Sequence, residues 1–297
     1  MLCHLSDPRV AEASGIVASA AYDDVFYTHN DSGDVARFFR INGSCRTTAT
    51  FDLSGVQARD WEDVSRGPGG TLWLGDIGDN SGTRAKGILV HRVAEPGPAG
   101  GEQRLRPTSF RLRYPDGPHD AEALLVHPRT GRVLVVTKGF AGATVYAAPL
   151  PLNAAGPNVL QEVGRVAVPE VTAGDISPDG SHVVLRNYTA AYEWKVAGDD
   201  VAGAFKAEPV RIALPPSPQG EAISYTRNGS SFVVVSEGAG ATVEEVDRPA
   251  PAAVRRPAPH ERSSPWPRRV ALAVVAAALL LAVGLVGLHR TRSARSR

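Results

Sequence analysis

The sequence predicts an all-β protein built as a β-propeller, and three observations support that prediction. A pattern of acidic residue, apolar run, turn and second apolar run occurs five times, at a spacing of about 50 residues. Gly, Pro, Asn and Asp gather between the runs, as is typical of tight turns. No segment before residue 270 keeps a helical apolar period over three turns. The five copies open at Glu12, Glu62, Glu122, Asp175 and Glu221.

Each repeat has room for about four strands, as a propeller blade requires. In the second copy we expect strands at 61–65, 71–76, 87–93 and 109–114. In the third we expect them at 123–127, 132–137, 144–148 and 162–168. The fifth offers only 222–226, 231–236 and 241–246. A strand from residues 3–10 would complete that blade and remove an open sheet edge.

The number of blades follows from the number of visible copies. Five copies favour five blades, whereas six or seven would require further copies or a lost N-terminal blade. The fourth copy is out of phase by about one residue, because Asp175 directly precedes Ile176. We therefore expect the Asp175 side chain to face differently from the four glutamates.

The two cysteines, Cys3 and Cys45, have neither zinc-site spacing nor a CxxC redox motif. Cys45 follows the third predicted strand of the first blade, beside the predicted closing strand. We hypothesise a disulfide between them, which suits an oxidising compartment. Two unrelated buried thiols are the alternative.

Charge divides the chain into an acidic and a basic part. Residues 248–297 hold ten Arg and one acid, which leaves 22 basic and 30 acidic residues in 1–247. An acidic domain argues against nucleic acid as a partner, because phosphates require a basic surface. It is compatible with a bound cation or a basic partner, or simply with a solvated acidic surface.

The C-terminal part predicts a membrane anchor. Residues 270–288 form a run of 19 residues without a charged side chain, which as a helix would span roughly 30 Å of hydrocarbon. Trp266 and flanking arginines suit the membrane interfaces. We assign 1–247 to the propeller, 248–267 to a Pro/Ala/Arg-rich linker, 270–288 to a transmembrane helix and 289–297 to a basic cytoplasmic tail.

Orientation rests on the basic tail, the stalk-like linker and the cysteine pair. Together they place the protein in the cell membrane, with the propeller extracellular and the C-terminus cytoplasmic. Residues 1–7 lack the basic and apolar regions of a signal peptide. We favour a start upstream of this sequence, so that the signal peptide is missing from it. The alternative is a tail-anchored protein with a cytoplasmic propeller.

The acids that open the repeats predict a metal site. The first strand of every blade lines the channel, so Glu12, Glu62, Glu122, Glu221 and Asp175 should converge near one mouth. Mutual repulsion there requires compensation. Ca²⁺ suits such an oxygen-rich ring, and Lys138, Arg186 or bound protons are the alternatives.

Further polar residues lie at the ends of the second strands or just before the acids that open the repeats. We expect these residues to line a ligand-binding funnel. Turn formation alone is the alternative for the Asp and Asn residues. His119, beside Asp120, is the candidate general base. The expected funnel residues are His29, Asp31, Asp60, Asp76, Asp120, Lys138, Arg186, Asn187 and Glu237.

The motif Glu12-Ala-Ser-Gly15-Ile16, with acids at the end of the next strand, resembles two groups of calcium-dependent propellers. They are the gluconolactonase/regucalcin group and the phytase-like esterases. Gly220-Glu221-Ala-Ile223 repeats the motif more loosely. In the lactonase group an opening Glu, an Asn and an Asp hold the ion. The resemblance implies Glu12 for the first role and Asn187 and Glu237 as candidates for the others.

A longer set of motifs, over about residues 3–247, resembles a family of uncharacterised bacterial membrane-anchored surface propellers. This resemblance implies architecture and location, and no substrate. The motifs are Thr28-His-Asn-Asp-Ser-Gly-Asp34, Arg59-Asp-Trp-Glu-Asp63, Gly75-Asp-Ile-Gly-Asp-Asn80, Asp120-Ala-Glu-Ala123, Asp175-Ile-Ser-Pro-Asp-Gly180 and Gln219-Gly-Glu-Ala222.

Two functions therefore compete. The first is a membrane-anchored binding or recognition module for an unknown protein or small molecule, with a divalent cation in its funnel. The second is a metal-dependent hydrolase of a lactone or phosphoester. A hydrolase requires an open coordination position and a base within reach. The sequence has no P-loop, Gly-x-Ser-x-Gly or HExxH motif that would name a reaction.

Overall fold

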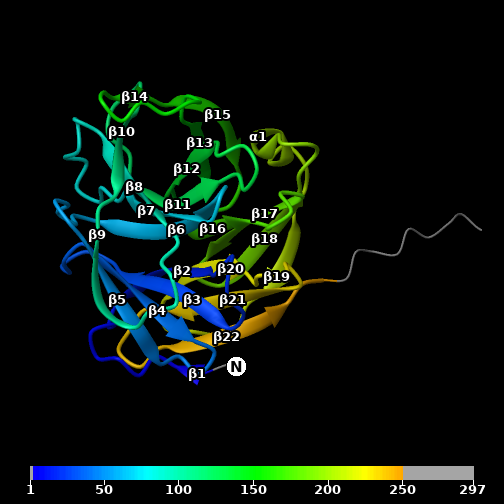
Figure 1. Cartoon of the computed structure of the whole chain (residues 1–297). Coiled ribbons are helices and arrows are strands. Elements are labelled where there is room, and N and C mark those ends of the chain that lie inside the picture. Colours follow the sequence, from blue (N-terminus) through cyan, green and yellow to red (C-terminus); the bar gives the residue numbers. More distant parts are fainter. Residues whose placement is uncertain (1–2, 250–297) are drawn as a thin grey trace, which may run out of the picture. The chain divides into compact units, whose positions relative to one another are not determined.

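Five β-sheets form a ring in the computed structural model, which describes residues 3–249. The innermost strand of each sheet lies around a common centre (Figure 1). This confirms the prediction of an all-β propeller with five blades. The innermost strands are β2 (Ala13–Ala18), β6 (Trp61–Gly67), β11 (Ala121–Val126), β16 (Val171–Ile176) and β20 (Gly220–Tyr225).

The other strands follow outward in each blade. Blade 1 continues with β3 (Val25–Asn30), β4 (Arg37–Asn42), β5 (Thr47–Leu53) and β9 (Gly101–Leu105). Blade 2 continues with β7 (Thr71–Asp76), β8 (Ile88–Ala94), β10 (Thr108–Arg113) and β14 (Asn158–Val159). Blade 3 continues with β12 (Val133–Thr137), β13 (Ala143–Ala147) and β15 (Gln161–Val166). Blade 4 continues with β17 (His182–Asn187), β18 (Ala190–Lys195) and β19 (Val210–Ala213), with the short helix α1 (Val201–Ala204) before β19.

Blade 5 closes the ring. Its strands β21 (Ser231–Ser236) and β22 (Thr242–Asp247) follow β20, and β1 (Cys3–His4) pairs antiparallel with β22. The closing strand is shorter than the 3–10 segment expected for it. A disulfide joins Cys3 to Cys45 in the β4–β5 turn of blade 1. Blade 5 and blade 1 are therefore held together covalently at the point of closure.

Two strands cross from one blade to the next, and the sequence pattern did not predict them. β9 follows blade 2 strand β8 in the chain but pairs parallel with β5 of blade 1. β14 pairs parallel with β10 of blade 2, although it lies between two strands of blade 3. Both additions cover an outer edge that would otherwise offer unpaired backbone groups.

The core consists of apolar layers within and between the blades. Tyr27, Phe38, Phe51 and Trp61 are fully buried in one of them, and the Phe38 and Phe51 rings stack 4.8 Å apart. The strands bury side chains on both faces of each sheet, because each blade is covered by its two neighbours.

The predicted transmembrane helix (270–288), the basic tail and nearly all of the linker lie outside the described residues. Within residues 3–249, none of the helical structure has the length and apolar character of a membrane span.

Candidate functional site

A β-bulge near the start of every innermost strand determines which side chains face the channel at the end where these strands begin. In each blade the pairing with the second strand slips by one residue at this point, so one side chain is turned out of the normal alternation. The equivalent bulge residues are Ser14, Glu62, Glu122, Thr172 and Glu221.

This register corrects the expected ring of five acids. Ser14, and not Glu12, occupies the bulge of blade 1, and Thr172, and not Asp175, occupies that of blade 4. Both hydroxyls donate to the backbone of the next blade, Ser14 Oγ to the Glu62 carbonyl and Thr172 Oγ1 to the Glu221 carbonyl. Only three of the five positions therefore carry carboxylates.

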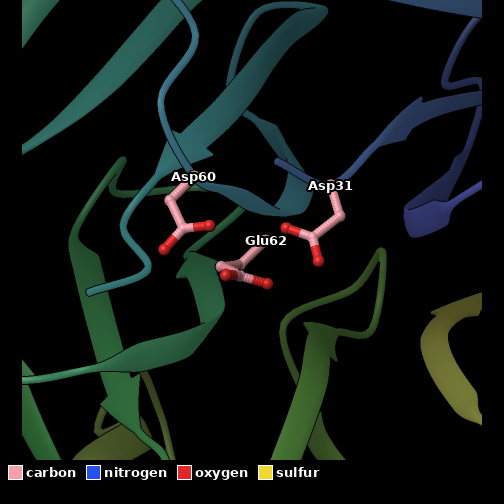
Figure 2. Close-up of side chains that lie close together, drawn as sticks. All are labelled: Asp31, Asp60 and Glu62. Carbon is pink, nitrogen blue, oxygen red and sulfur yellow. The ribbon is translucent and has the colours of Figure 1, made fainter. Parts of the chain in front are cut away.

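The carboxylates gather instead in two trios that share Glu62. In each trio, one oxygen from each residue lies within 4.8 Å of the others. Asp31, from the loop after β3, and Asp60, just before β6, meet Glu62 in the first trio, and Figure 2 shows the three side chains pointing into a common space. Asp120 and Glu122 complete the second trio. The five acids come from blades 1, 2 and 3.

Burial and mutual repulsion raise the pKa of the three acids of the first trio. Burial, followed by the charges of Glu122 and Asp31, raises the pKa of Glu62 well above its usual range. Burial and the Asp31 and Asp120 charges raise the pKa of Asp60 to about 6. Burial likewise raises the pKa of Asp31. A group that stabilises negative charge here would reverse these shifts.

The backbone also approaches the first trio closely. A Cβ at Gly78 would lie 2.1 Å from Glu62 Oε1 and 2.5 Å from Asp60 Oδ2. A side chain at position 78 would have to displace these two carboxylates, so glycine suits this place in the β7–β8 loop. The Gly78 amide donates to the Asp60 carbonyl at 3.2 Å, which fixes the loop against the start of β6.

Lys138 partly balances the second trio. Its Nζ lies 2.9 Å from Glu122 Oε1 and 5.3 Å from the centroid of the Tyr188 ring. Burial nevertheless raises the pKa of Glu122 to about 8, against the opposing effect of Lys138. The first trio has no cationic side chain within salt-bridge distance among residues 3–249, so its negative charge is not neutralised in the same way.

Two other predicted acids lie at the edge of the same mouth. Glu221 is buried, and burial raises its pKa. Burial and the Glu221 and Glu12 charges raise the pKa of Glu237. Glu12 is exposed, and it belongs to neither trio.

Three further predicted funnel residues are engaged in the scaffold. Asp76 forms a buried ion pair with Arg84 at 2.6 Å and accepts from the Asp60 amide. Arg186 donates to the carbonyls of Asn187 and Ala222, and to no carboxylate of the described chain. Asn187 Oδ1 accepts from the amides of Thr189 and Ala190, which makes it a turn residue.

The two histidines do not reach the acids. His29 is fully buried, with its ring 5.5 Å from that of Trp61, and burial lowers its pKa to about 4. His119 points toward blade 3, where its Nε2 lies 3.0 Å from Asp116 and 3.1 Å from Tyr146 Oη. The structure thus places neither beside the trios, and His119 is corrected as a candidate base.

Deeper in the channel, acids bind backbone amides of the neighbouring blades. Asp63, which the sequence did not single out, is fully buried and accepts from the Leu124 and Gly174 amides. Asp175 accepts from the Tyr225 amide and Ser224 Oγ. These acids satisfy inner-strand amides that have no partner strand on that side. The phase of Asp175 in the sequence already sets it apart from the four glutamates, and aligning the apolar residues after each bulge also identifies Thr172 as the equivalent residue of blade 4.

No protein-family model and no curated protein matches this chain. The resemblances based on its motifs therefore stay predictions, and the geometry of the mouth carries the functional conclusion.

Proposed function

We propose that this protein is a membrane-anchored, cell-surface recognition module whose propeller holds a divalent cation, Ca²⁺ by preference, at the acidic mouth. The run 270–288 supports the anchor, and the basic tail supports an extracellular propeller. The ion would link blades 1 and 2 and present an anion-binding position to a protein or small-molecule ligand.

The observation that carries this proposal is the first trio, Asp31, Asp60 and Glu62. Their carboxylate oxygens lie close together, and no cationic side chain of residues 3–249 forms a salt bridge with them. All ligand atoms are oxygens, which are the donors that Ca²⁺ and Mg²⁺ prefer. Gly78 keeps the space beside Glu62 and Asp60 free of a side chain. Zinc is disfavoured, because no histidine or thiol joins the group.

The test is thermal unfolding of the purified full-length chain in detergent, first with EDTA and then with Ca²⁺, Mg²⁺, Mn²⁺ or Zn²⁺. We expect a saturable rise in melting temperature with Ca²⁺, since an ion that binds only the folded state at 100 times its Kd stabilises it by about 2.7 kcal/mol. Glu62→Gln should abolish that rise, because Glu62 belongs to both trios.

The same variant provides its own folding control. Without metal, Glu62→Gln should melt no lower than the wild type, since it replaces a buried carboxyl whose ionisation burial and the neighbouring acids disfavour. Glu12→Gln removes an exposed glutamate outside both trios and should keep the Ca²⁺ response. A chain that shows no response to any of the four ions, or a Glu62→Gln variant that responds like the wild type, would refute the cation site.

A hydrolase is the second candidate, and Asp60 is the observation that favours it. Asp60 is a half-buried carboxyl at the edge of the trio with a pKa of about 6 when no ion is bound, and it would be suited to accept a proton near neutral pH if Asp31 and Glu62 held the ion without it. A bound ion would act there as a Lewis acid and activate water. Turnover of lactones or phosphoesters that Asp60→Asn abolishes would support this function over simple recognition.

A further inference from the structure

A cavity of about 1040 Å³ lies at the opposite end of the channel from the acidic trios. It is lined by the turns that join the first and second strands of all five blades. Pro68, Pro128 and Pro178 come from three of these turns, and Tyr22 and Asn228 from the other two. The turns are set close together, because a Cβ at Gly131 or Gly229 would lie 3.3 Å from the proline ring of a neighbouring blade.

Arg66, near the end of β6, also lines this cavity and is only 8% exposed. Arg66 forms an ion pair with Asp175, whose Oδ2 lies 3.7 Å from Nη2, too far for a hydrogen bond. Asp175 already accepts from Ser224 Oγ and the Tyr225 amide through that oxygen. Among residues 3–249, no group accepts a hydrogen bond from the Arg66 guanidinium, and its Nη2 is buried without a partner.

An unsatisfied guanidinium in this position is costly unless something else pairs with it. Removing a charged group from water requires compensating hydrogen bonds. The planar fork of an arginine matches a carboxylate, which accepts two parallel N–H bonds. The cavity opens onto Arg66 and supplies room for such a partner.

The charges around the cavity restrict the rest of the partner. Arg227 also lines the cavity, but its Nη1 is paired with Asp23 at 2.6 Å. Asp24 and Glu245 are lining acids that form no salt bridge within the described part of the chain. Outside the ion pairs Arg66–Asp175 and Arg227–Asp23, the lining charges are two exposed carboxylates, and Arg66 is the deep cation that still lacks a hydrogen-bond acceptor among the described residues. This pattern favours a molecule with one carboxylate and a positive group beyond it.

We propose that this cavity binds an organic carboxylate that also carries a positive charge, with the carboxylate on Arg66 and the cationic group near Asp24 and Glu245. A peptide C-terminus that follows a basic residue and a free basic amino acid share this chemistry. The site is separate from the acidic mouth and does not depend on a bound cation.

The experiment is calorimetric titration of the full-length protein in detergent with three probes. They are acetyl-lysyl-alanine with a free carboxylate, the same dipeptide as its C-terminal amide, and free lysine. We expect saturable binding of the free-carboxylate dipeptide and at least tenfold weaker binding of the amide. Binding of lysine in place of the dipeptide would assign the site to free amino acids, and the reverse would assign it to peptide C-termini.

Variants test the role of Arg66 directly. Arg66→Gln should weaken binding at least tenfold, Arg66→Lys should keep only part of it, and Arg111→Gln, an exposed arginine on β10, should bind like the wild type. If Arg66→Gln does not fold, ¹⁵N NMR spectra of the wild type are recorded instead. Addition of the carboxylate probe must then shift the Nε–H signal of one buried arginine. Absence of binding by both lysine and the free dipeptide, or equal binding of the amide, overturns the proposal.

Discussion

Asp60 and Glu122 carry the electrostatic consequence of the acidic mouth. Both are carboxyl groups whose pKa burial raises, to about 6 for Asp60 and about 8 for Glu122. Each keeps a proton in the folded state at a pH where the unfolded chain has lost it. Such groups lower the free energy of unfolding as the pH rises from the unfolded pKa to the folded one.

This gives a pH prediction for the metal-free protein. Asp60→Asn should gain stability relative to the wild type as the pH rises from about 4 to about 6, and the difference should stay constant above that. Urea unfolding in EDTA, measured for both proteins from pH 4.5 to 8.5, provides the comparison.

The comparison with the variant is essential, because buried histidines act in the opposite sense. Burial lowers the pKa of His29 and of His91 to about 4, so both favour folding more as the pH rises through the same range. These contributions are common to both proteins and cancel in the difference. A difference that does not change with pH would show that Asp60 titrates normally.

At the scale of elements, the β-bulges decide which residues face the channel. The bulge turns Glu62, Glu122 and Glu221 inward, and it assigns the equivalent places in blades 1 and 4 to Ser14 and Thr172. The sequence pattern located the strands but not this irregularity. Acidic residues at similar positions in the five repeats therefore lie at different places in the channel.

The end of the last blade shows a similar limit. Arg248, which the composition placed in the linker, contacts the propeller through its guanidinium. Its Nε lies 2.7 Å from Glu193 Oε1, and its Nη1 donates to the Gly229 carbonyl at 2.8 Å. Charge and composition did not indicate these contacts, because they depend on which loops lie beside β22.

The closing element gives a stability prediction. β1 is two residues long, and the disulfide spans 42 residues of sequence, so the bond restricts the unfolded chain strongly. Its loss should cost about 4 kcal/mol of unfolding free energy by the loop-entropy relation. Urea unfolding with and without reductant measures this.

The double variant Cys3→Ser/Cys45→Ser is the control for that experiment. It should be as unstable as the reduced wild type, and reductant should not change it further. Equal stability of oxidised and reduced wild type would mean that β1 and the apolar contacts around it close the ring unaided.

At the scale of the whole molecule, the ring separates two chemically different mouths. One end gathers the acidic trios, and the other holds the cavity around Arg66. Between them, Asp63 and Asp175 bind amides of neighbouring blades and fix the inner strands. Sites at the two ends can therefore be altered separately.

The proposed orientation is tested on cells that make the protein natively. Lys86, Lys195 and Lys206 are exposed on the propeller, so a membrane-impermeant amine reagent should label them in intact cells. A cytoplasmic protein of known location serves as the control for intact membranes. Labelling that appears only after permeabilisation would reverse the orientation and support the tail-anchored alternative.

The sequence alone determined the repeat, the five blades and most strand positions, because periodic apolar runs and turn residues are local signals. It also placed the acids of the trios near one mouth. Only the tertiary structure decided which acids meet, since a one-residue bulge changes the direction of a side chain. It likewise decided that Arg66 lines a cavity without a hydrogen-bond acceptor among the described residues and that His29 and His119 point elsewhere. Such contacts join residues far apart in the chain, and no local pattern records them.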